Sequence, residues 1–384
     1  MSKIERERIP AITGVGAAFG KNEISNERVS QLLGIREKTI GRMMSMTGAG
    51  IEHRRWVDSS QLGVTQTLTN PNDPKDPNYW KEHGLEVAAS DLASEALLRA
   101  SEMAGIDVKN IKAIVGASGS QDLRGVPIAA MIQDKLGLPR STRAHDVYSA
   151  CPGWLQALRN TYDSLLSPLT EGGPQAAIGS EVLSPILSKE RSSLFVLFGD
   201  AAGATVVDNV IPDEGAPKVM AFEFGSDGSL AQELCMPGGG SKYPSSQETL
   251  DADLHTLLMN GPVVAEHAVN YMAEATQAAL KKAGISREDV DWIIPHQANR
   301  GIMDDTYKRI MGDTADAAGI PYGNMIATVH KYGNTSASTI PIAMAEAIQE
   351  GKLKRNQLVV VTSFGAGFVY GAAVLSMVGL PKKA

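Results

Sequence analysis

A cysteine followed by a helical pattern is the first candidate for covalent chemistry in this chain. Small residues surround Cys151, and the apolar spacing at 154–166 is typical of a helix. A thiol at the start of a helix lies near the positive end of the backbone dipole, which favours the nucleophilic thiolate. The alternative is a buried cysteine that packs as a small hydrophobic side chain, the usual fate of a free cysteine. The second cysteine, Cys235, is interpreted as structural.

His296 and Asn334 are the candidate partners of this thiol. His296 follows a buried-strand pattern at 292–294 and stands in the motif Pro-His-Gln-Ala-Asn, so it can face a cleft at the strand end. Asn334 precedes a helical pattern at 339–348, where it could equally serve only as a helix cap. No pair of the seven histidines has metal-ligand spacing, so no metal site is predicted.

A glycine-rich turn, Phe-Gly-Ala-Gly-Phe at 364–368, is the third candidate. Such a turn can direct backbone N–H groups at the oxyanion of an acyl-transfer reaction. The alternative is a tight glycine turn between two core strands, with no chemical role.

An internal repeat is expected to position these three stretches. Residues 104–115 align without gaps to 283–294, and each segment follows an alanine-rich helix and ends in a buried strand. Extending the repeat places 149–151 opposite 333–337. We therefore predict a duplicated α/β protein with halves at 1–210 and 211–384, in which a pseudo-dyad brings Cys151 and Asn334 into one cleft.

Apolar periodicity and turn residues predict the remaining elements. The expected strands lie at 9–18, 111–116, 176–179 and 196–207, and the expected helices at 26–33, 85–104 and 128–136. A polar, proline-rich stretch at 58–79 is predicted to be an insertion or lid. The stretch 224–253 is predicted to be a long loop.

The composition argues against several classes of protein. The 384 residues are 43% hydrophobic and 21% charged, as in ordinary globular proteins, and the net charge of −7 comes without a basic run for nucleic acid. The charged N-terminus does not resemble a signal peptide, and no apolar run reaches transmembrane length. Two cysteines suit a reducing compartment. We expect a cytoplasmic protein without nucleic-acid or membrane partners.

Taken together, the motifs resemble the thiolase superfamily and, more narrowly, β-ketoacyl-acyl-carrier-protein synthase III, whose members use a Cys-His-Asn set. The four motifs occur in the family's order, and the resemblance runs nearly end to end. It implies a five-layer αβαβα fold, acyltransferase activity and no cofactor. It also implies that Cys151, His296 and Asn334 are catalytic, and that the backbone N–H groups of Cys151 and Ala366 form the oxyanion hole.

The family mechanism gives these residues their roles. Cys151 would take an acyl group from acyl-CoA or an acyl-acyl-carrier protein. His296 and Asn334 would then stabilise the enolate that forms when malonyl-CoA or malonyl-acyl-carrier protein loses carbon dioxide. The carbanion attacks the acyl-enzyme and releases a β-ketoacyl thioester. The resemblance also implies a homodimer, because the family's primer pocket is completed across a dimer interface near Val126.

Departures from the family pattern concern substrate recognition. Family members that prime with acetyl-CoA carry a Trp and an Arg before the early Thr-Gly, whereas this chain keeps only Arg42 among methionines, which predicts altered CoA binding. Val126 replaces an aromatic residue and would leave room for a primer longer than acetyl. The further substrate contacts implied by the resemblance are Gly365, Gly367, Phe368 and Asn299.

Carrier docking is also expected to differ from the family pattern. Glu266 stands where the family often has a docking lysine, so docking could use Lys281, Lys282 and Arg300.

Two other functions remain open. One is an acyltransferase or thioesterase on the same fold, in which an alcohol or water accepts the acyl group. The other is a non-catalytic partner subunit of a synthase, although such subunits often lose the nucleophile or the His-Asn pair.

Overall fold

Two β-sheets with corresponding arrangements of strands form the frame of the molecule. The computed structural model describes residues 7–46, 48–57, 87–170, 172–312 and 323–382, so the expected insertion at 58–79 lies outside the described residues. The first sheet has the order β1-β7-β6-β4-β5. Its strands are β1 (Ile9–Phe19), β4 (Ala113–Ala117), β5 (Arg143–Asp146), β6 (Gln175–Glu181) and β7 (Ala201–Val210).

The second sheet repeats the arrangement of the first. Its described strands are ordered β8-β13-β12-β11 and comprise β8 (Met220–Ser226), β11 (Trp292–Pro295), β12 (Leu358–Gly365) and β13 (Val369–Ser376). In each sheet two antiparallel pairings are followed by a parallel one: β1-β7, β7-β6 and β6-β4, then β8-β13, β13-β12 and β12-β11. Met325 bridges β11 in parallel, where β5 flanks β4 in the first sheet.

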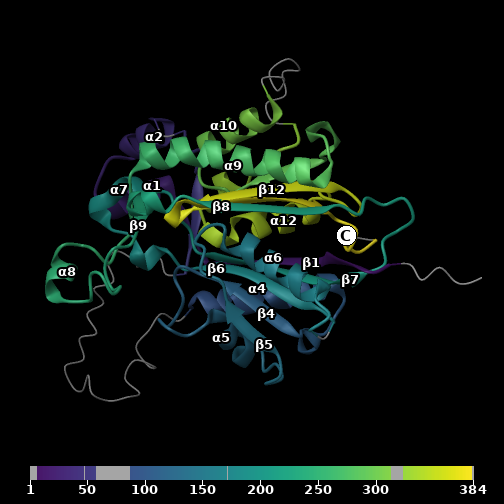
Figure 1. Ribbon diagram of the computed structural model, residues 1–384. Helices are drawn as coiled ribbons and strands as arrows, with labels where there is room; N and C mark the ends of the chain where they lie inside the picture. Colours follow the sequence, from purple (N-terminus) through teal and green to yellow (C-terminus); the bar gives the residue numbers. More distant parts are fainter. Residues whose placement is uncertain (1–6, 47, 58–86, 171, 313–322, 383–384) are drawn as a thin grey trace, which may run out of the picture.

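Helices complete five layers. Figure 1 shows α9 (Gly261–Ala283) and α10 (Arg300–Met311) over the outer face of the second sheet, and α4 (Ala89–Ala104) and α5 (Ile128–Lys135) against the first. The helices α6 (Gly153–Leu166) and α12 (Thr339–Gln349) lie between the sheets. Their apolar side chains join residues of both sheets in one buried cluster. The expected αβαβα fold is confirmed.

Local features of the internal repeat recur in the structure. Gly105 ends α4 with φ 68 and ψ 30, and Gly284 ends α9 with φ 67 and ψ 27, the left-handed conformation that glycine adopts without strain. Each is followed by a short 3-10 turn and a parallel strand. The boundary between the predicted halves, at 210/211, falls between β7 and β8 and stays a prediction.

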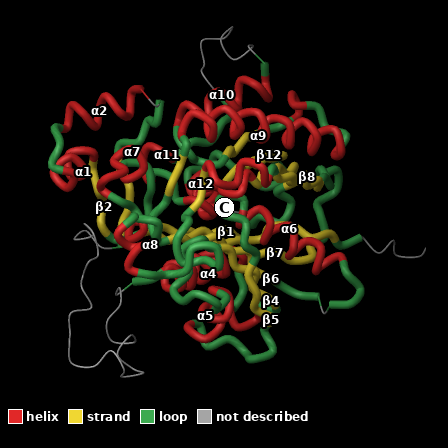
Figure 2. Tube along the Cα trace, turned by 60° about the vertical axis from the view of Figure 1, so that its left-hand side comes forward, coloured by secondary structure: helices red, strands yellow, loops and turns green. Residues whose placement is uncertain are grey.

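A side layer packs beside the two sheets and carries the early part of the chain. It contains β2 (Asn22–Ser25), α1 (Asn26–Leu33), α2 (Glu37–Met46), β3 (His53–Trp56), α7 (Ser192–Phe195) and α11 (Val329–Tyr332). Figure 2 shows α1, α2 and α7 gathered on one side of the molecule. Their apolar side chains share a separate buried cluster that includes Trp56 and Phe195.

Two sequence predictions were wrong in detail. The strand expected at 196–207 begins only at Ala201, because 192–195 is helical and Phe198 instead makes an isolated parallel bridge to Asn334. The stretch 224–253 is more ordered than a loop, with a 3-10 segment (Gly228–Glu233), β9 (Leu234–Cys235) and α8 (Gln247–Asp251). The pairing of β9 with β10 (Leu258–Met259) is short, and alternation is hard to detect over so few residues.

None of the described helices is both long enough and apolar enough to cross a bilayer.

Candidate active site

Cys151 lies at the start of the central helix α6, as the sequence predicts. The helix begins at Gly153, and Ala150 before the cysteine has φ 45, a sharp turn that presents the thiol at the end of the helix. The expected resting thiolate is not found, however. Burial raises the pKa of the Cys151 thiol to about 12, and the nearby Glu181 acts in the same direction. Cys151 is therefore a neutral thiol at pH 7 and must lose a proton before it attacks.

Backbone hydrogen bonds to the first half of the chain hold Asn334, which belongs to the second half, in place. Asn334 N donates to Leu197 O at 2.8 Å, and Gly199 N donates to Asn334 O at 3.0 Å. The side-chain oxygen accepts from Ser336 N at 2.8 Å, which leaves the carboxamide NH2 as the end able to donate to a substrate. Asn334 does not cap α12, because the N-cap residue of that helix is Ser338.

His296 directly follows β11 and is almost fully enclosed. Its backbone N–H donates to Thr362 O at 2.7 Å, and only 2% of the residue is exposed. The ring Nδ1 lies 2.7 Å from Thr339 Oγ1 at the start of α12. Burial lowers the pKa of His296 to about 3, so the imidazole is neutral at pH 7.

Contacts among neighbouring residues bring the three predicted residues to one place. Ser336, two residues after Asn334, has its hydroxyl 3.4 Å from Cys151 Sγ. Thr339, on the same segment, holds the ring of His296. The segment 334–339 therefore links the cysteine of the first half to the histidine of the second.

The glycine turn closes the site from the end of β12. A Cβ atom placed on Gly365 would lie 2.8 Å from Cys151 N and 2.7 Å from Pro152 Cδ, which only glycine avoids. Gly367 has φ 76 and Phe368 has φ 51, so the backbone turns sharply past Ala366. Phe368 is fully buried and packs edge-on against Phe364, with ring centroids 5.1 Å apart. This close approach fits an oxyanion hole built from Cys151 and Ala366.

Three further residues predicted to contact substrate are Asn299, Arg42 and Val126. Asn299 caps α10, because its Oδ1 accepts from Ile302 N at 2.9 Å. Arg42 is exposed on α2, and Val126 is 37% exposed just before α5. A contact with substrate stays a prediction for each of them.

Two of the residues expected to dock a carrier protein have partners within the chain. Lys282 donates to Phe222 O at 3.0 Å, and Arg300 forms an ion pair with Asp304 at 2.6 Å. Lys281 is exposed on α9, as is Glu266. Their docking role stays a prediction.

Sequence reasoning missed several residues of the site. Ser336 and Thr339 stand in the stretch that holds Asn334, but no pattern showed which hydroxyl would meet the thiol and which the imidazole. Gln297, beside His296, supports the site by accepting from Thr328 N at 2.7 Å and Val329 N at 3.2 Å. Glu181 carried no sequence signal, because its partner Ser336 lies 155 residues away.

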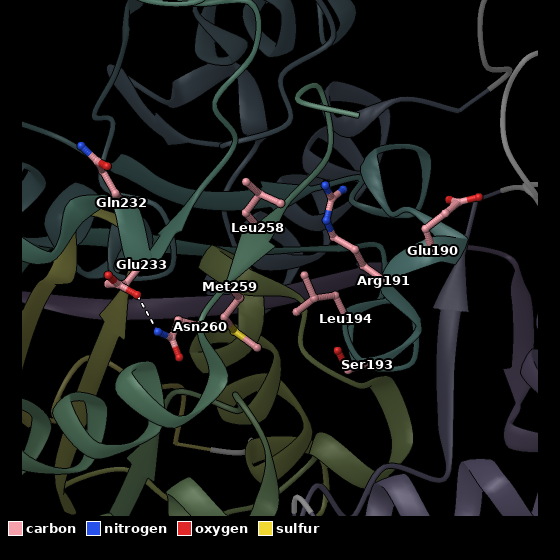
Figure 3. A pocket seen from close by; sticks show the side chains of 9 residues that line it. All are labelled: Glu190, Arg191, Ser193, Leu194, Gln232, Glu233, Leu258, Met259 and Asn260. Atoms are coloured by element: carbon pink, nitrogen blue, oxygen red, sulfur yellow. Dashed lines mark hydrogen bonds between the residues drawn. The ribbon is translucent and has the colours of Figure 1, made fainter. Parts of the chain in front are cut away.

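A separate cavity of about 410 Å³ opens beside the side layer (Figure 3). It contains none of the three predicted catalytic residues. Its one basic side chain, Arg191, forms an ion pair with Asp253, and two acidic residues, Glu190 and Glu233, also line it. The cavity therefore has no excess positive charge. Its lining residues are Glu190, Arg191, Ser193, Leu194, Gln232, Glu233, Leu258, Met259 and Asn260.

The duplicated sheets and the thiol, imidazole and carboxamide gathered between them define a condensing enzyme of the thiolase-fold class. Family models of 3-oxoacyl-acyl-carrier-protein synthase III match residues 145–228 and, for its C-terminal part, 280–377. The chain is 33% identical over 364 residues to the β-ketoacyl-acyl-carrier-protein synthase III of Symbiobacterium thermophilum, covering 95% of this chain and 97% of the relative. The chain belongs to this synthase III family and is an acyltransferase.

Further relatives agree with this assignment. The synthase III of Clostridioides difficile is 32% identical over 367 residues, covering 95% of this chain and 97% of that protein. The crystal structure of 3-oxoacyl-acyl-carrier-protein synthase III from Aquifex aeolicus superimposes with a TM-score of 0.74 at 28% identity, covering 96% of this chain and 99% of that one.

Proposed function

We propose that this enzyme transfers an acyl group to Cys151 and then condenses it with a malonyl thioester, with loss of carbon dioxide. The observation that carries the proposal is the meeting of Cys151, Asn334 and His296 through the segment 334–339. A nucleophile, an amide donor and a buried imidazole in one site supply the groups that both half-reactions require.

In the first half-reaction the Cys151 sulphur attacks the carbonyl carbon of the primer thioester. The backbone N–H groups of Cys151 and Ala366 would donate to the developing oxyanion, and Gly365 allows these two segments to approach closely. Collapse of the intermediate releases the carrier thiol and leaves the acyl group on Cys151.

In the second half-reaction a malonyl thioester loses carbon dioxide. The negative charge passes to the thioester oxygen of the enolate, where the Asn334 NH2 group and the His296 ring would donate hydrogen bonds. Because burial keeps His296 neutral, the ring can donate from Nε2 only when its Nδ1 accepts from Thr339. The carbanion then attacks the acyl-enzyme and frees Cys151.

The substrates are proposed as acyl-CoA or acyl-acyl-carrier protein and malonyl-acyl-carrier protein or malonyl-CoA. We propose a primer longer than acetyl because Val126 is smaller than the aromatic residue of acetyl-selective relatives. A homodimer in the cytoplasm is proposed on the same resemblance.

Intact mass spectrometry tests the first half-reaction. The enzyme is incubated with acyl-CoA and acyl-acyl-carrier primers from acetyl to dodecanoyl. We expect a mass increase equal to one acyl group, lost in Cys151→Ala and retained in Cys235→Ala, the matched change at the other cysteine. If no primer gives an adduct, the proposal is contradicted and a non-catalytic partner subunit is favoured.

A further inference from the structure

Glu181 is a buried carboxylate to which the proposed function gives no role. It ends β6, is fully buried, and has no basic partner among the described residues. Its Oε2 accepts from Ser120 Oγ at 2.6 Å and from Gly119 N at 3.0 Å. Its Oε1 lies 3.1 Å from Ser336 Oγ. A buried carboxylate without a cation is costly, so its place beside the nucleophile calls for an explanation.

Ser336 connects this carboxylate to the nucleophile. Its single hydroxyl lies 3.1 Å from Glu181 Oε1 and 3.4 Å from Cys151 Sγ. One hydroxyl proton cannot be donated to both neighbours at once. When Cys151 is a thiol, Ser336 can accept from S–H and donate to the carboxylate, which forms a continuous path from sulphur to Glu181.

The backbone holds this hydroxyl in place. Ser336 has φ 51, a conformation that residues other than glycine rarely adopt, and its N–H donates to Asn334 Oδ1 at 2.8 Å. Across the repeat, Ala150 holds the matching position, three residues before its helix, with φ 45. The two turns direct the Ser336 hydroxyl and the Cys151 thiol toward each other.

We propose that Ser336 is a catalytic residue and that Glu181, acting through it, accepts the proton that Cys151 loses during acylation. The Cys151 proton passes to Ser336 Oγ while the Ser336 proton passes to Glu181. Cys151 and Glu181 together therefore keep a single negative charge, which now lies on the Cys151 sulphur. The sulphur then forms a bond to the primer carbonyl carbon, and the bond to the carrier sulphur breaks. The departing carrier thiolate takes up the proton that Glu181 had accepted, and Glu181 ends as a carboxylate. This inference rests on the proposed acyl-enzyme.

If Glu181 acts only as a fixed charge, its removal should have the opposite effect on the reactivity of Cys151. A carboxylate near sulphur raises the pKa of the thiol, so its removal would then make Cys151 more reactive. If Glu181 accepts the proton, its removal makes Cys151 less reactive. In the described part of the chain His296 makes no hydrogen bond to Cys151, and its Nδ1 is held by Thr339.

The experiment measures the rate at which iodoacetamide alkylates Cys151 between pH 5.5 and 9.5, in a Cys235→Ala background so that a single thiol reports. The variants are Glu181→Gln, Ser336→Gly and Ser336→Ala. Ser338→Ala is the control, because Ser338 Oγ donates to Thr335 O at 2.8 Å in the same segment. Single-turnover acylation by the preferred primer is measured in parallel, and thermal melting checks the fold.

We expect Glu181→Gln and Ser336→Gly to slow both reactions at pH 7 by about tenfold or more, with the alkylation profile moved to higher pH. Ser338→Ala should match the parent. Equal or faster alkylation in Glu181→Gln would overturn the inference. It would also be overturned if Ser336→Ala were slow and Ser336→Gly were not, because backbone strain, and not the hydroxyl, would then control the rate.

Failure of the proposed function gives a different pattern. If no primer acylates the parent enzyme but the alkylation profiles move as stated, the acyl-transfer proposal fails and the proton path stands. If acylation proceeds at the parent rate in both Glu181→Gln and Ser336→Gly, the proton path fails and the proposed function stands. If Glu181→Gln fails to fold, the alkylation and acylation rates of Ser336→Gly decide whether the proton path exists.

Discussion

One hydroxyl determines which nitrogen of His296 carries the proton. Thr339 Oγ1 lies 2.7 Å from His296 Nδ1 and 3.0 Å from Ser336 O, and its proton can go to either. Donation to Nδ1 places the ring proton on Nε2, the tautomer that can stabilise the enolate. Without the hydroxyl, this tautomer loses its support.

Thr339→Val should therefore impair the second half-reaction selectively. We expect malonyl-thioester decarboxylation to fall by about 10- to 100-fold, the usual effect of removing the partner that orients a functional histidine. Acyl-adduct formation on Cys151 should remain close to that of the parent. Thr276→Val, which removes a buried hydroxyl on the outer helix α9, is the control. Equal losses in both half-reactions would show a general structural effect.

Val126 should set primer length. Val126→Phe fills space in the proposed primer pocket, so the ratio of kcat/KM for octanoyl to acetyl primers should fall by about 10-fold or more, the scale on which apolar pockets discriminate. The ratio is measured by competition between the two primers. An unchanged ratio would remove Val126 from the primer pocket.

At the scale of elements, the end of β12 and the turn before α6 must approach closely for the oxyanion hole to form. A Cβ on Gly365 would lie 2.8 Å from Cys151 N, so Gly365→Ala must push these segments apart. We expect a loss of about 1–3 kcal/mol in the free energy of unfolding, as for other overpacked sites. Acylation should fall by about 10²-fold or more, because hydrogen bonds to an oxyanion depend steeply on distance.

Gly261→Ala is the matched control for this change. Gly261 begins α9, and a Cβ there would meet nothing within 4 Å. Chemical denaturation and single-turnover acylation are measured for both variants. If Gly365→Ala acylates as fast as the control, the close approach is not required for catalysis.

Elements with strong local signals were predictable from the sequence. The helix at 26–33 matches α1, because Ser25 caps it and Gly34 ends it with φ 65. The repeat in the sequence has a counterpart in the fold, because Gly105 and Gly284 end their helices in the same left-handed conformation. It could not predict that 196–200 leaves the strand, since that departure depends on the bridge from Phe198 to Asn334, which is distant in sequence.

The candidate site was only partly predictable for the same reason. Residue type and motif pointed to Cys151, His296 and Asn334, whereas Glu181 and Ser336 acquire their relation only through folding. The helix position of Cys151 suggested a thiolate, but helix position alone does not report burial. Burial disfavours the charged form and is the largest cause of the raised pKa of the Cys151 thiol.

At the scale of the whole molecule, the buried neutral His296 makes stability depend on pH. Its pKa is about 3 in the folded protein, below the 6.5 of a free histidine, so between these values the unfolded chain binds a proton that the folded protein does not. This histidine therefore stabilises the fold less as the pH falls below 6.5. Its contribution should decrease by about 2 kcal/mol from pH 7 to pH 5.

Comparison with His296→Asn isolates this effect from other titrating groups. The free energy of unfolding in urea is measured for both proteins between pH 5 and 7.5. The parent should lose stability relative to His296→Asn as the pH falls. Parallel curves would show that His296 is not held neutral by burial.

The proposed function requires one site to perform both acyl transfer and decarboxylative condensation. The most direct test supplies acyl-loaded enzyme with malonyl-acyl-carrier protein labelled at the carboxyl carbon, and measures released carbon dioxide together with the β-ketoacyl product. We predict one carbon dioxide per product in the parent, and adduct without carbon dioxide in His296→Ala and Asn334→Ala. Release of the acyl group to water or an alcohol, without labelled carbon dioxide, would contradict the proposed function.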